Sequence, residues 1–140
     1  MTTLFTKIID GDIPGRFVWR DEEVVAFLTI NPITPGHTLV VPRAEVDHWL
    51  DLPVALAERC MAVAQVIGQA QMAAFSPTRI GLIIAGLEVP HTHLHLIPID
   101  MEADLSFAKA DPSPDPAALD DAADRLRDAL RTAGRSEVAS

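Results

Sequence analysis

Residues 91–99 read His-Thr-His-Leu-His-Leu-Ile-Pro-Ile, and the alternation in this stretch predicts a β-strand. Side chains alternate between the two faces of a strand, so His91, His93 and His95 are expected to project from one face at intervals of about 6.6–6.8 Å. The residues between them are expected to turn to the other face, under a helix. Three imidazoles on one face serve no evident packing purpose. Because imidazole titrates near neutral pH, the row is the candidate active site.

The rest of the chain supplies the elements that would surround this strand. Apolar spacing, proline positions and β-branched runs predict helices and strands joined by short links. Residues 100–114, with few ordering signals, are expected to form a loop. The order of elements predicts an α+β fold in which helices pack on a five-stranded antiparallel sheet. The expected elements are a short helix at 3–10, strands at 17–20, 24–30 and 37–41, a long helix at 53–75, strands at 79–85 and 92–99, and a helix at 116–132.

Charge and composition exclude several classes of function. A net charge of −9 argues against a nucleic-acid polymer as partner, since that binding neutralises many phosphates with Lys and Arg. One phosphate of a small molecule can still be held by a few histidines and backbone amides. No apolar run approaches the ~20 residues of a membrane span, so no membrane partner is expected. The single cysteine, Cys60, and the lack of a signal peptide predict a cytoplasmic protein.

Two chemistries suit the histidine row. A neutral imidazole nitrogen can attack phosphorus and form a covalent intermediate that water then hydrolyses. His-x-His is also a good pair of zinc ligands, which would take a third ligand from His37, His48 or a carboxylate such as Glu88. The residues alone leave a metal-dependent hydrolase open as the alternative.

The histidine row resembles the signature of the histidine-triad (HIT) family, three alternating histidines separated and followed by apolar residues. The segment at 36–42, Gly-His-Thr-Leu-Val-Val-Pro, resembles the third strand of that family. Further segments also resemble the family, namely Phe5–Ile9, Val25–Leu28 and Ala85-Gly86. The resemblance runs in collinear order over about residues 3–99. It implies a HIT-like fold in a domain at 1–99, with 100–140 as a C-terminal extension, a loop and a terminal helix, packed on the same domain.

The resemblance also implies an activity. HIT proteins are nucleotidyl hydrolases or transferases that cleave a phosphoramidate, phosphoric ester or anhydride at the α-phosphate through a covalent histidine intermediate. It implies that His93 is the nucleophile, that His91 and His95 position it and contact the phosphate, and that His37 joins the same hydrogen-bonded site. A small nucleotide-like phosphorylated substrate, a homodimer and no cofactor or catalytic metal are implied. Some bacterial members hold structural zinc with Cys-x-x-Cys, but here Thr3 and Thr6 stand at those positions.

The pocket departs from the family in ways that affect substrate recognition. Thr29 replaces an acidic residue that holds the ribose hydroxyls, Leu87 replaces a glutamine near the leaving group, and an asparagine before Ala-Gly is missing. Each lost polar contact weakens a transition-state interaction by about 1–3 kcal/mol. A HIT-fold nucleotide-binding protein with little catalytic activity is therefore a further alternative. The expected substrate-pocket residues are Phe27, Leu28, Thr29, Ile30, Leu87 and Glu88.

Overall fold

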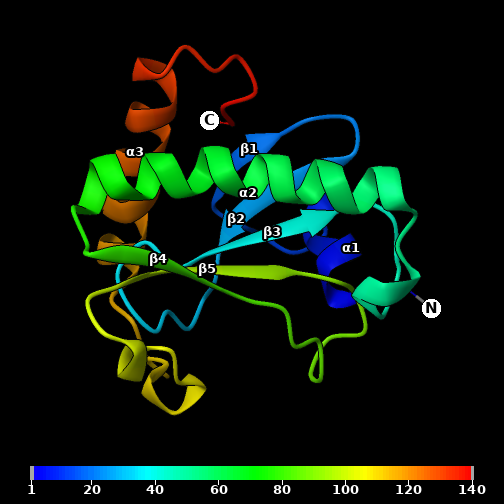
Figure 1. Ribbon diagram of the computed structural model, residues 1–140, viewed down its shortest axis with the longest axis horizontal. Coiled ribbons are helices and arrows are strands. Elements are labelled where there is room, and N and C mark those ends of the chain that lie inside the picture. Colours follow the sequence, from blue (N-terminus) through cyan, green and yellow to red (C-terminus); the bar gives the residue numbers. More distant parts are fainter. Residues whose placement is uncertain (1, 140) are drawn as a thin grey trace.

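The computed structural model describes residues 2–139 and contains a five-stranded antiparallel sheet with α-helices packed on it (Figure 1). This confirms the expected α+β class, with a short N-terminal helix, one long helix and a C-terminal helix. No helix in the described range combines the length and the apolar character needed to span a membrane. The main elements are α1 (Leu4–Ile9), β1 (Phe17–Arg20), β2 (Val24–Leu28), β3 (Thr38–Pro42), α2 (Val54–Phe75), β4 (Arg79–Ile83), β5 (Leu94–Ile99) and α3 (Pro116–Thr132).

The strand order in the sheet is β1-β2-β3-β5-β4, and every neighbouring pair is antiparallel. The long helix α2 carries the chain from β3, at the centre, to β4, at the edge (Figure 1). β5 then returns between them, with Leu39 of β3 and Ile83 of β4 opposite His95 on its two sides. The topology therefore brings His95 into the interior of the sheet, beside the strand that follows His37.

Three strands differ from the sequence expectation at one end. β2 stops at Leu28, before a loop whose two prolines remove backbone donors, and β4 stops at Ile83. β5 begins only at Leu94, so His95 is the one member of the histidine row that lies in a paired strand. The preceding residues leave the ladder because the backbone N–H of Thr92 donates to the carbonyl of Val46 at 2.7 Å.

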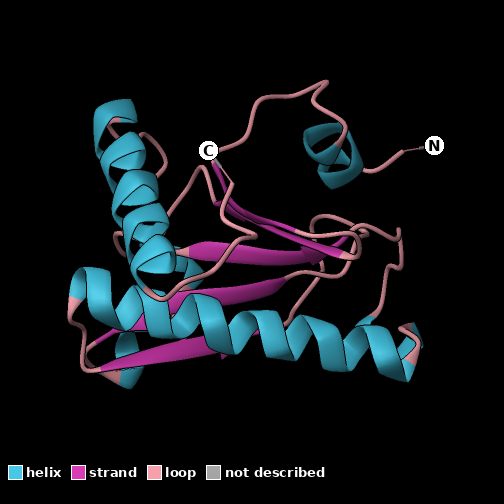
Figure 2. Cartoon of the chain, turned by 90° about the horizontal axis from the view of Figure 1, so that it is seen from above, coloured by secondary structure: helices cyan, strands magenta, loops and turns pink. Residues whose placement is uncertain are grey.

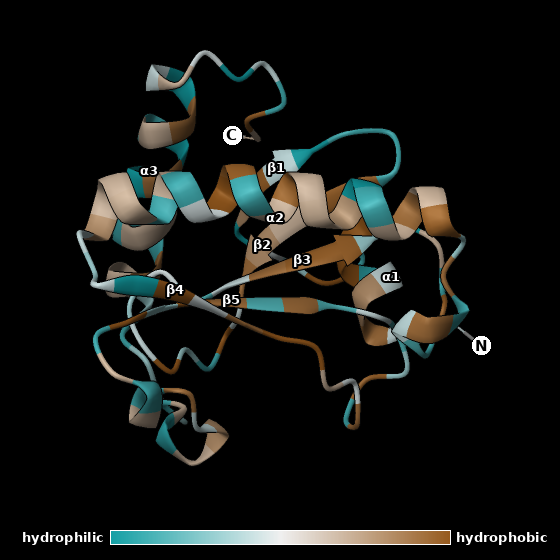
Figure 3. Cartoon of the chain, viewed as in Figure 1, coloured by the Kyte–Doolittle hydropathy of each residue, from teal (hydrophilic) through white to brown (hydrophobic). Residues whose placement is uncertain are grey.

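The two faces of the sheet are covered by different helices. α2 lies along one face, whereas α1 lies on the opposite side (Figures 1 and 2). The larger core fills the space between the sheet, α2 and α3, and Leu94 and Leu96 point into it as the alternation predicted. The smaller core, on the α1 side, contains Phe5 and Phe27. The central strand β3 is hydrophobic along its length, because both of its faces are buried (Figure 3).

One polar side chain, that of Gln71 on α2, lies fully inside the larger core. Its amide nitrogen donates to the carbonyl of Gly36 at 2.9 Å and to that of Leu96 at 3.0 Å. These bonds tie α2 to the loop that carries His37 and to the strand that carries His95. Gln71 thus fixes the relative position of two parts of the site from the far side of the sheet.

Residues 100–114 are more ordered than the expected loop. They contain two 3-10 turns, η2 (Glu102–Asp104) and η3 (Phe107–Lys109). The side-chain amide of Asn31 donates to the carbonyl of Asp111, and the Asp111 N–H donates to the carbonyl of Pro32, both at 2.9 Å. The segment is therefore fastened to the β2–β3 loop, and the α3 helix that follows packs across α2 and β1.

Candidate active site

Three imidazole rings converge on the α1 side of the sheet. The ring of His95 lies 4.9 Å from that of His93 and 5.2 Å from that of His37, measured between centroids. His93 is 6% exposed and His37 is 2% exposed, while His95 is half-buried. The structure therefore brings these three residues together, although only His95 belongs to a strand.

A chain of hydrogen bonds assigns the protons of His37 and His95. The backbone N–H of Ile33 donates to Nδ1 of His37 at 3.0 Å, so the His37 proton is on Nε2. That Nε2 lies 3.0 Å from Nδ1 of His95 and donates to it, which leaves the proton of His95 on its own Nε2. Burial lowers the pKa of His37 to about 3 and that of His95 to about 4. Repulsion between protonated rings, of His95 on His37 and of His93 on His95, lowers each pKa further. Both rings are thus neutral near pH 7, and His95 presents an N–H donor.

In His93 the proton lies on Nδ1, in contrast to His37 and His95, which carry it on Nε2. Its Nδ1 lies 2.7 Å from the carbonyl oxygen of His91, which can only accept, so Nδ1 carries the proton. Burial lowers the pKa of His93, while the same hydrogen bond and the nearby Glu88 oppose that shift. Nε2 has no hydrogen-bond partner among residues 2–139. The neutral ring therefore offers an unshared electron pair on Nε2, next to the N–H donor of His95.

His91 is turned inward and fully buried. Its Nε2 donates to the carbonyl of Pro42 at 2.7 Å, and its Nδ1 lies 2.7 Å from the hydroxyl of Thr3. Both ring nitrogens are occupied by the protein itself. His91 thus supports His93 through its backbone carbonyl, and its ring is not placed to contact a phosphate, in contrast to the expectation from the resemblance.

A cavity of about 380 Å³ opens beside His93. It lies between the turn that includes η1 (Trp49–Asp51) and the loop that joins β4 to β5. Leu87 is 95% exposed and forms part of its wall, so this loop offers an apolar side chain next to the candidate nucleophile. The lining residues are Asp47, His48, Trp49, Ile84, Ala85, Gly86, Leu87, Thr92 and His93.

The other predicted pocket residues are dispersed. Phe27 belongs to the smaller core on the α1 side of the sheet, and the centroid of its ring lies 5.6 Å from that of Phe5. Leu28 is a correction, because its side chain alternates to the opposite face and packs in the core under α2. Ile30 is 68% exposed in the β2–β3 loop, and the hydroxyl of Thr29 accepts a hydrogen bond from the N–H of Asn31. Glu88 is exposed near His93.

Two aromatic residues complete the site and were not predicted for it. The ring of Phe5 on α1 meets His93 edge-on at 4.8 Å between centroids. The ring of Phe107 in η3 meets His95 in the same manner at 4.9 Å. Both rings cover an imidazole, and burial is the largest cause of the lowered pKa values of His93 and His95. The signal that could have found Phe5 was its place in the apolar face of α1; no comparable periodicity surrounds Phe107.

The positions of a structural zinc site do not suit a metal in this chain. Thr3 and Thr6 offer neutral hydroxyls where zinc takes thiolates, imidazoles or carboxylates. The Thr3 backbone N–H donates to Glu45 at 2.8 Å, and its hydroxyl contacts His91. In the described part of the chain, no three His, Cys, Asp or Glu side chains converge as a metal-binding group. The hydroxyls instead take part in a hydrogen-bond network.

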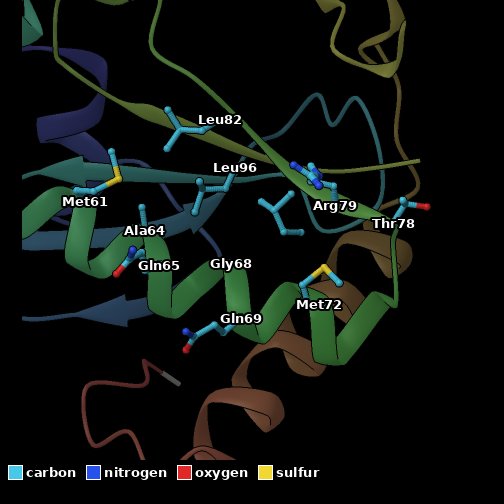
Figure 4. Close-up of a pocket in the computed structure, with 11 residues that line it drawn as sticks. Met61, Ala64, Gln65, Gly68, Gln69, Met72, Thr78, Arg79, Leu82 and Leu96 are labelled. Atoms are coloured by element: carbon cyan, nitrogen blue, oxygen red, sulfur yellow. The ribbon is translucent and has the colours of Figure 1, made fainter. Parts of the chain in front are cut away.

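A second hollow, of about 530 Å³, lies between α2 and the edge strand β4 (Figure 4). No histidine lines it, and most of its lining side chains are apolar or amides. Met61, Met72 and Leu82 are 46%, 41% and 38% exposed, so apolar side chains face solvent along an unpaired strand edge. Such an edge is a template for pairing with another chain.

Comparisons with known proteins agree with this geometry. A family model described as HIT domain matches residues 10–102. An uncharacterized HIT-like protein of Borreliella burgdorferi is 39% identical over 102 residues, which span 68% of this chain and 73% of that protein. The adenosine 5'-monophosphoramidase HNT1 of Saccharomyces cerevisiae is 31% identical over 96 residues, 68% of this chain and 61% of that protein. A zinc-bound histidine triad family protein of Mycobacterium smegmatis has a TM-score of 0.82 and 29% identity, with 96% of each chain covered.

Proposed function

Because the chain belongs to the HIT domain family, we propose that it is a nucleotidyl hydrolase or transferase with His93 as its nucleophile. The substrate is a small nucleotide-like molecule carrying a phosphoramidate, phosphoric ester or anhydride at its α-phosphate. The observation that carries the proposal is the bond from Nδ1 of His93 to the carbonyl of His91, which leaves Nε2 unprotonated and unpartnered within residues 2–139.

In the proposed reaction the Nε2 electron pair of His93 attacks phosphorus. A P–Nε2 bond forms, the bond to the leaving group breaks, and the leaving group departs with the electron pair of the broken bond and takes up a proton from solvent. Water then attacks phosphorus, and the electron pair of the P–Nε2 bond returns to Nε2. One hydrogen of the water stays on the released phosphate and the other returns to solvent as a proton, so His93 is regenerated neutral. The Nε2–H of His95 donates to a non-bridging phosphate oxygen, where negative charge accumulates in the transition state.

Similarity to an adenosine 5'-monophosphoramidase supports a nucleoside monophosphate linked through nitrogen as the substrate class. The apolar wall at Leu87 and the hydroxyl at Thr29 favour an uncharged leaving group and weaker recognition of ribose than a carboxylate would give. The same two residues favour a second candidate, a nucleotide-binding HIT protein with little turnover. A metal-dependent hydrolase receives no support from the arrangement of ligand side chains in residues 2–139.

A homodimer belongs to the same proposal. The exposed apolar side chains of Met61, Met72 and Leu82, together with the free edge of β4, form a surface suited to a second copy of the chain. Leu82→Glu is expected to shift the protein to the monomer in light scattering. Glu22→Gln, exposed in the turn between β1 and β2 at the other end of the sheet, is expected to leave its mass unchanged. The cytoplasmic setting stays a prediction that rests on the single free cysteine, Cys60.

The test of the catalytic role is a His93→Gly variant with adenosine 5'-phosphoramidate as substrate. Turnover and acid-labile labelling of the protein by phosphorus are expected in the wild type and absent in the variant, with partial recovery on adding imidazole. A His93→Gly protein that is folded and fully active would contradict the proposal. Wild-type protein that binds AMP but does not turn over would favour the binding protein, and loss of activity with a chelator would favour the metal enzyme.

A further inference from the structure

The segment that carries the candidate nucleophile is held outside the sheet, by backbone and side-chain hydrogen bonds. Strand pairing of β5 begins at Leu94, so His91, Thr92 and His93 lie outside the ladder. Thr92 is tied to the carbonyl of Val46 through its backbone N–H at 2.7 Å and its hydroxyl at 2.8 Å. The remaining side-chain anchor of the segment is the buried ring of His91. The position of the carbonyl that orients His93 therefore depends on what holds that ring.

The His91 ring is held at both ends by residues far away in the sequence. Its Nε2 donates to the carbonyl of Pro42, an acceptor only, so its Nδ1 must accept if the ring is neutral. The hydroxyl of Thr3 lies 2.7 Å from Nδ1 and 3.2 Å from the hydroxyl of Thr6. The Thr3 hydroxyl has a single proton, and it donates this proton to Nδ1 of His91, which is the nearer of the two acceptors. The Pro42 carbonyl thereby sets the tautomer of His91, and the Thr3 hydroxyl holds the orientation of its ring from the other side.

Thr3 is in turn held by its own neighbours. Its oxygen accepts from the backbone N–H of Thr6 at 3.1 Å, which caps α1, and its backbone N–H donates to Glu45 at 2.8 Å. Hydrogen bonds from the Thr6 hydroxyl and from the Thr3 N–H lower the pKa of Glu45, so the carboxylate is the form that binds. Both functions of the Thr3 hydroxyl, as cap acceptor and as donor to His91, are used at the same time.

We propose that Thr3 is a positioning residue for His93, acting through the line Thr3 hydroxyl, His91 ring, His91 carbonyl, His93 Nδ1–H. This inference rests on the proposed function of His93. It gives the hydroxyl of Thr3, at a position where the resemblance places a zinc-binding cysteine, a role as hydrogen-bond donor to His91. The nucleophile is thus oriented from the N-terminal helix.

Three substitutions separate donation to His91 from capping of α1. Thr3→Ser keeps both functions, Thr3→Val removes both, and Thr3→Asp keeps the cap acceptor but, when ionised, cannot donate. The exposed neighbour Thr2→Val is the matched control. Imidazole ¹⁵N–¹H spectra without substrate report the tautomers of His91 and His93, and steady-state rates with adenosine 5'-phosphoramidate report kcat and KM.

Thr3→Val and Thr3→Asp are expected to change the His91 signals and to lower kcat by up to about 100-fold with little change in KM, as expected for a displaced catalytic group. Thr3→Ser and Thr2→Val are expected to resemble the wild type. Unchanged His91 signals in both Thr3→Val and Thr3→Asp would overturn the inference, as would Thr3→Asp behaving like Thr3→Ser. Because the spectra need no substrate, a wild-type protein without turnover would refute the proposed function and leave this test intact.

Discussion

The Nε2 atom of His37 lies 3.0 Å from Nδ1 of His95, and this single bond sets the chemical character of the site. His37 already accepts from the N–H of Ile33, so it can only donate to His95. His95 must then turn its own N–H outward, next to the unprotonated Nε2 of His93. A backbone N–H in the β2–β3 loop thus makes His95 the donor, while the carbonyl of His91 leaves Nε2 of His93 unprotonated.

The stability of the protein is expected to fall in mild acid because His37 and His95 are neutral in the folded state. Their pKa values are about 3 and about 4 when folded, below the ordinary 6.5, so the unfolded chain binds more protons between these limits. The contribution of these two histidines to the free energy of unfolding is therefore fully present above about pH 6.5. It decreases toward pH 4 by up to about 1.4 kcal/mol per pH unit for each histidine. Urea unfolding at about pH 7 and about pH 5 measures this decrease. The His37→Gln variant is expected to show a shallower dependence; equal slopes would show that His37 does not contribute.

Phe107 is expected to control the protonation of His95. Its ring covers one side of the imidazole at 4.9 Å, and the largest cause of the lowered pKa of His95 is burial. Phe107→Ala admits water and is expected to raise that pKa toward its ordinary value, whereas Phe107→Leu keeps an apolar cover and most of the shift. An NMR titration of the His95 ring measures the pKa in each variant. Identical titrations of the wild type and Phe107→Ala would show that Phe107 does not influence the pKa of His95.

Much of this fold could be predicted because its signals are local. The alternation at 91–99, the proline-free run of α2 and the N-cap of α3 at Asp115 each act over a few residues. The contacts of Phe107, Thr3 and Gln71 join segments that are distant in the sequence, and no local pattern specifies them. The ends of strands were also predicted incorrectly. The sequence places the start of β5 at Thr92, but the N–H of Thr92 donates to Val46 instead of to a neighbouring strand, and β5 begins at Leu94. The convergence of the histidines followed from the motif, whereas the inward turn of His91 required the structure.

Replacing Gln71 is expected to destabilise the protein and disturb the site together. Its amide satisfies the buried carbonyls of Gly36 and Leu96 at 2.9 and 3.0 Å, while its own carbonyl oxygen has no partner among residues 2–139. Gln71→Met fills the space but removes both donated hydrogen bonds. The Gly36 carbonyl keeps its bond from the Thr38 hydroxyl at 2.8 Å, so the expected loss is about 1–3 kcal/mol, the cost of one unpaired buried group. Urea unfolding gives this loss, and the His37 and His95 ring signals report the movement. The control is Gln69→Met at an exposed position of the same helix. An equal effect there would mean that the two hydrogen bonds of the Gln71 amide contribute nothing to stability.

The rate of the reaction is expected to depend on pH through His93, and Glu88 is expected to tune that dependence. Since only the neutral ring can attack, kcat/KM falls as the pH drops through the pKa of His93, which burial holds below 6.5. The nearby Glu88 carboxylate raises that pKa, so Glu88→Gln is expected to move the acid limb to lower pH and to keep more activity in mild acid. Because Glu88 is exposed, the difference between the two proteins is expected to shrink as salt is added. Profiles of kcat/KM with adenosine 5'-phosphoramidate at low and high ionic strength measure both effects. An acid limb at or above pH 6.5, or one that Glu88→Gln moves upward, would contradict the assignment of the nucleophile and its electrostatic environment.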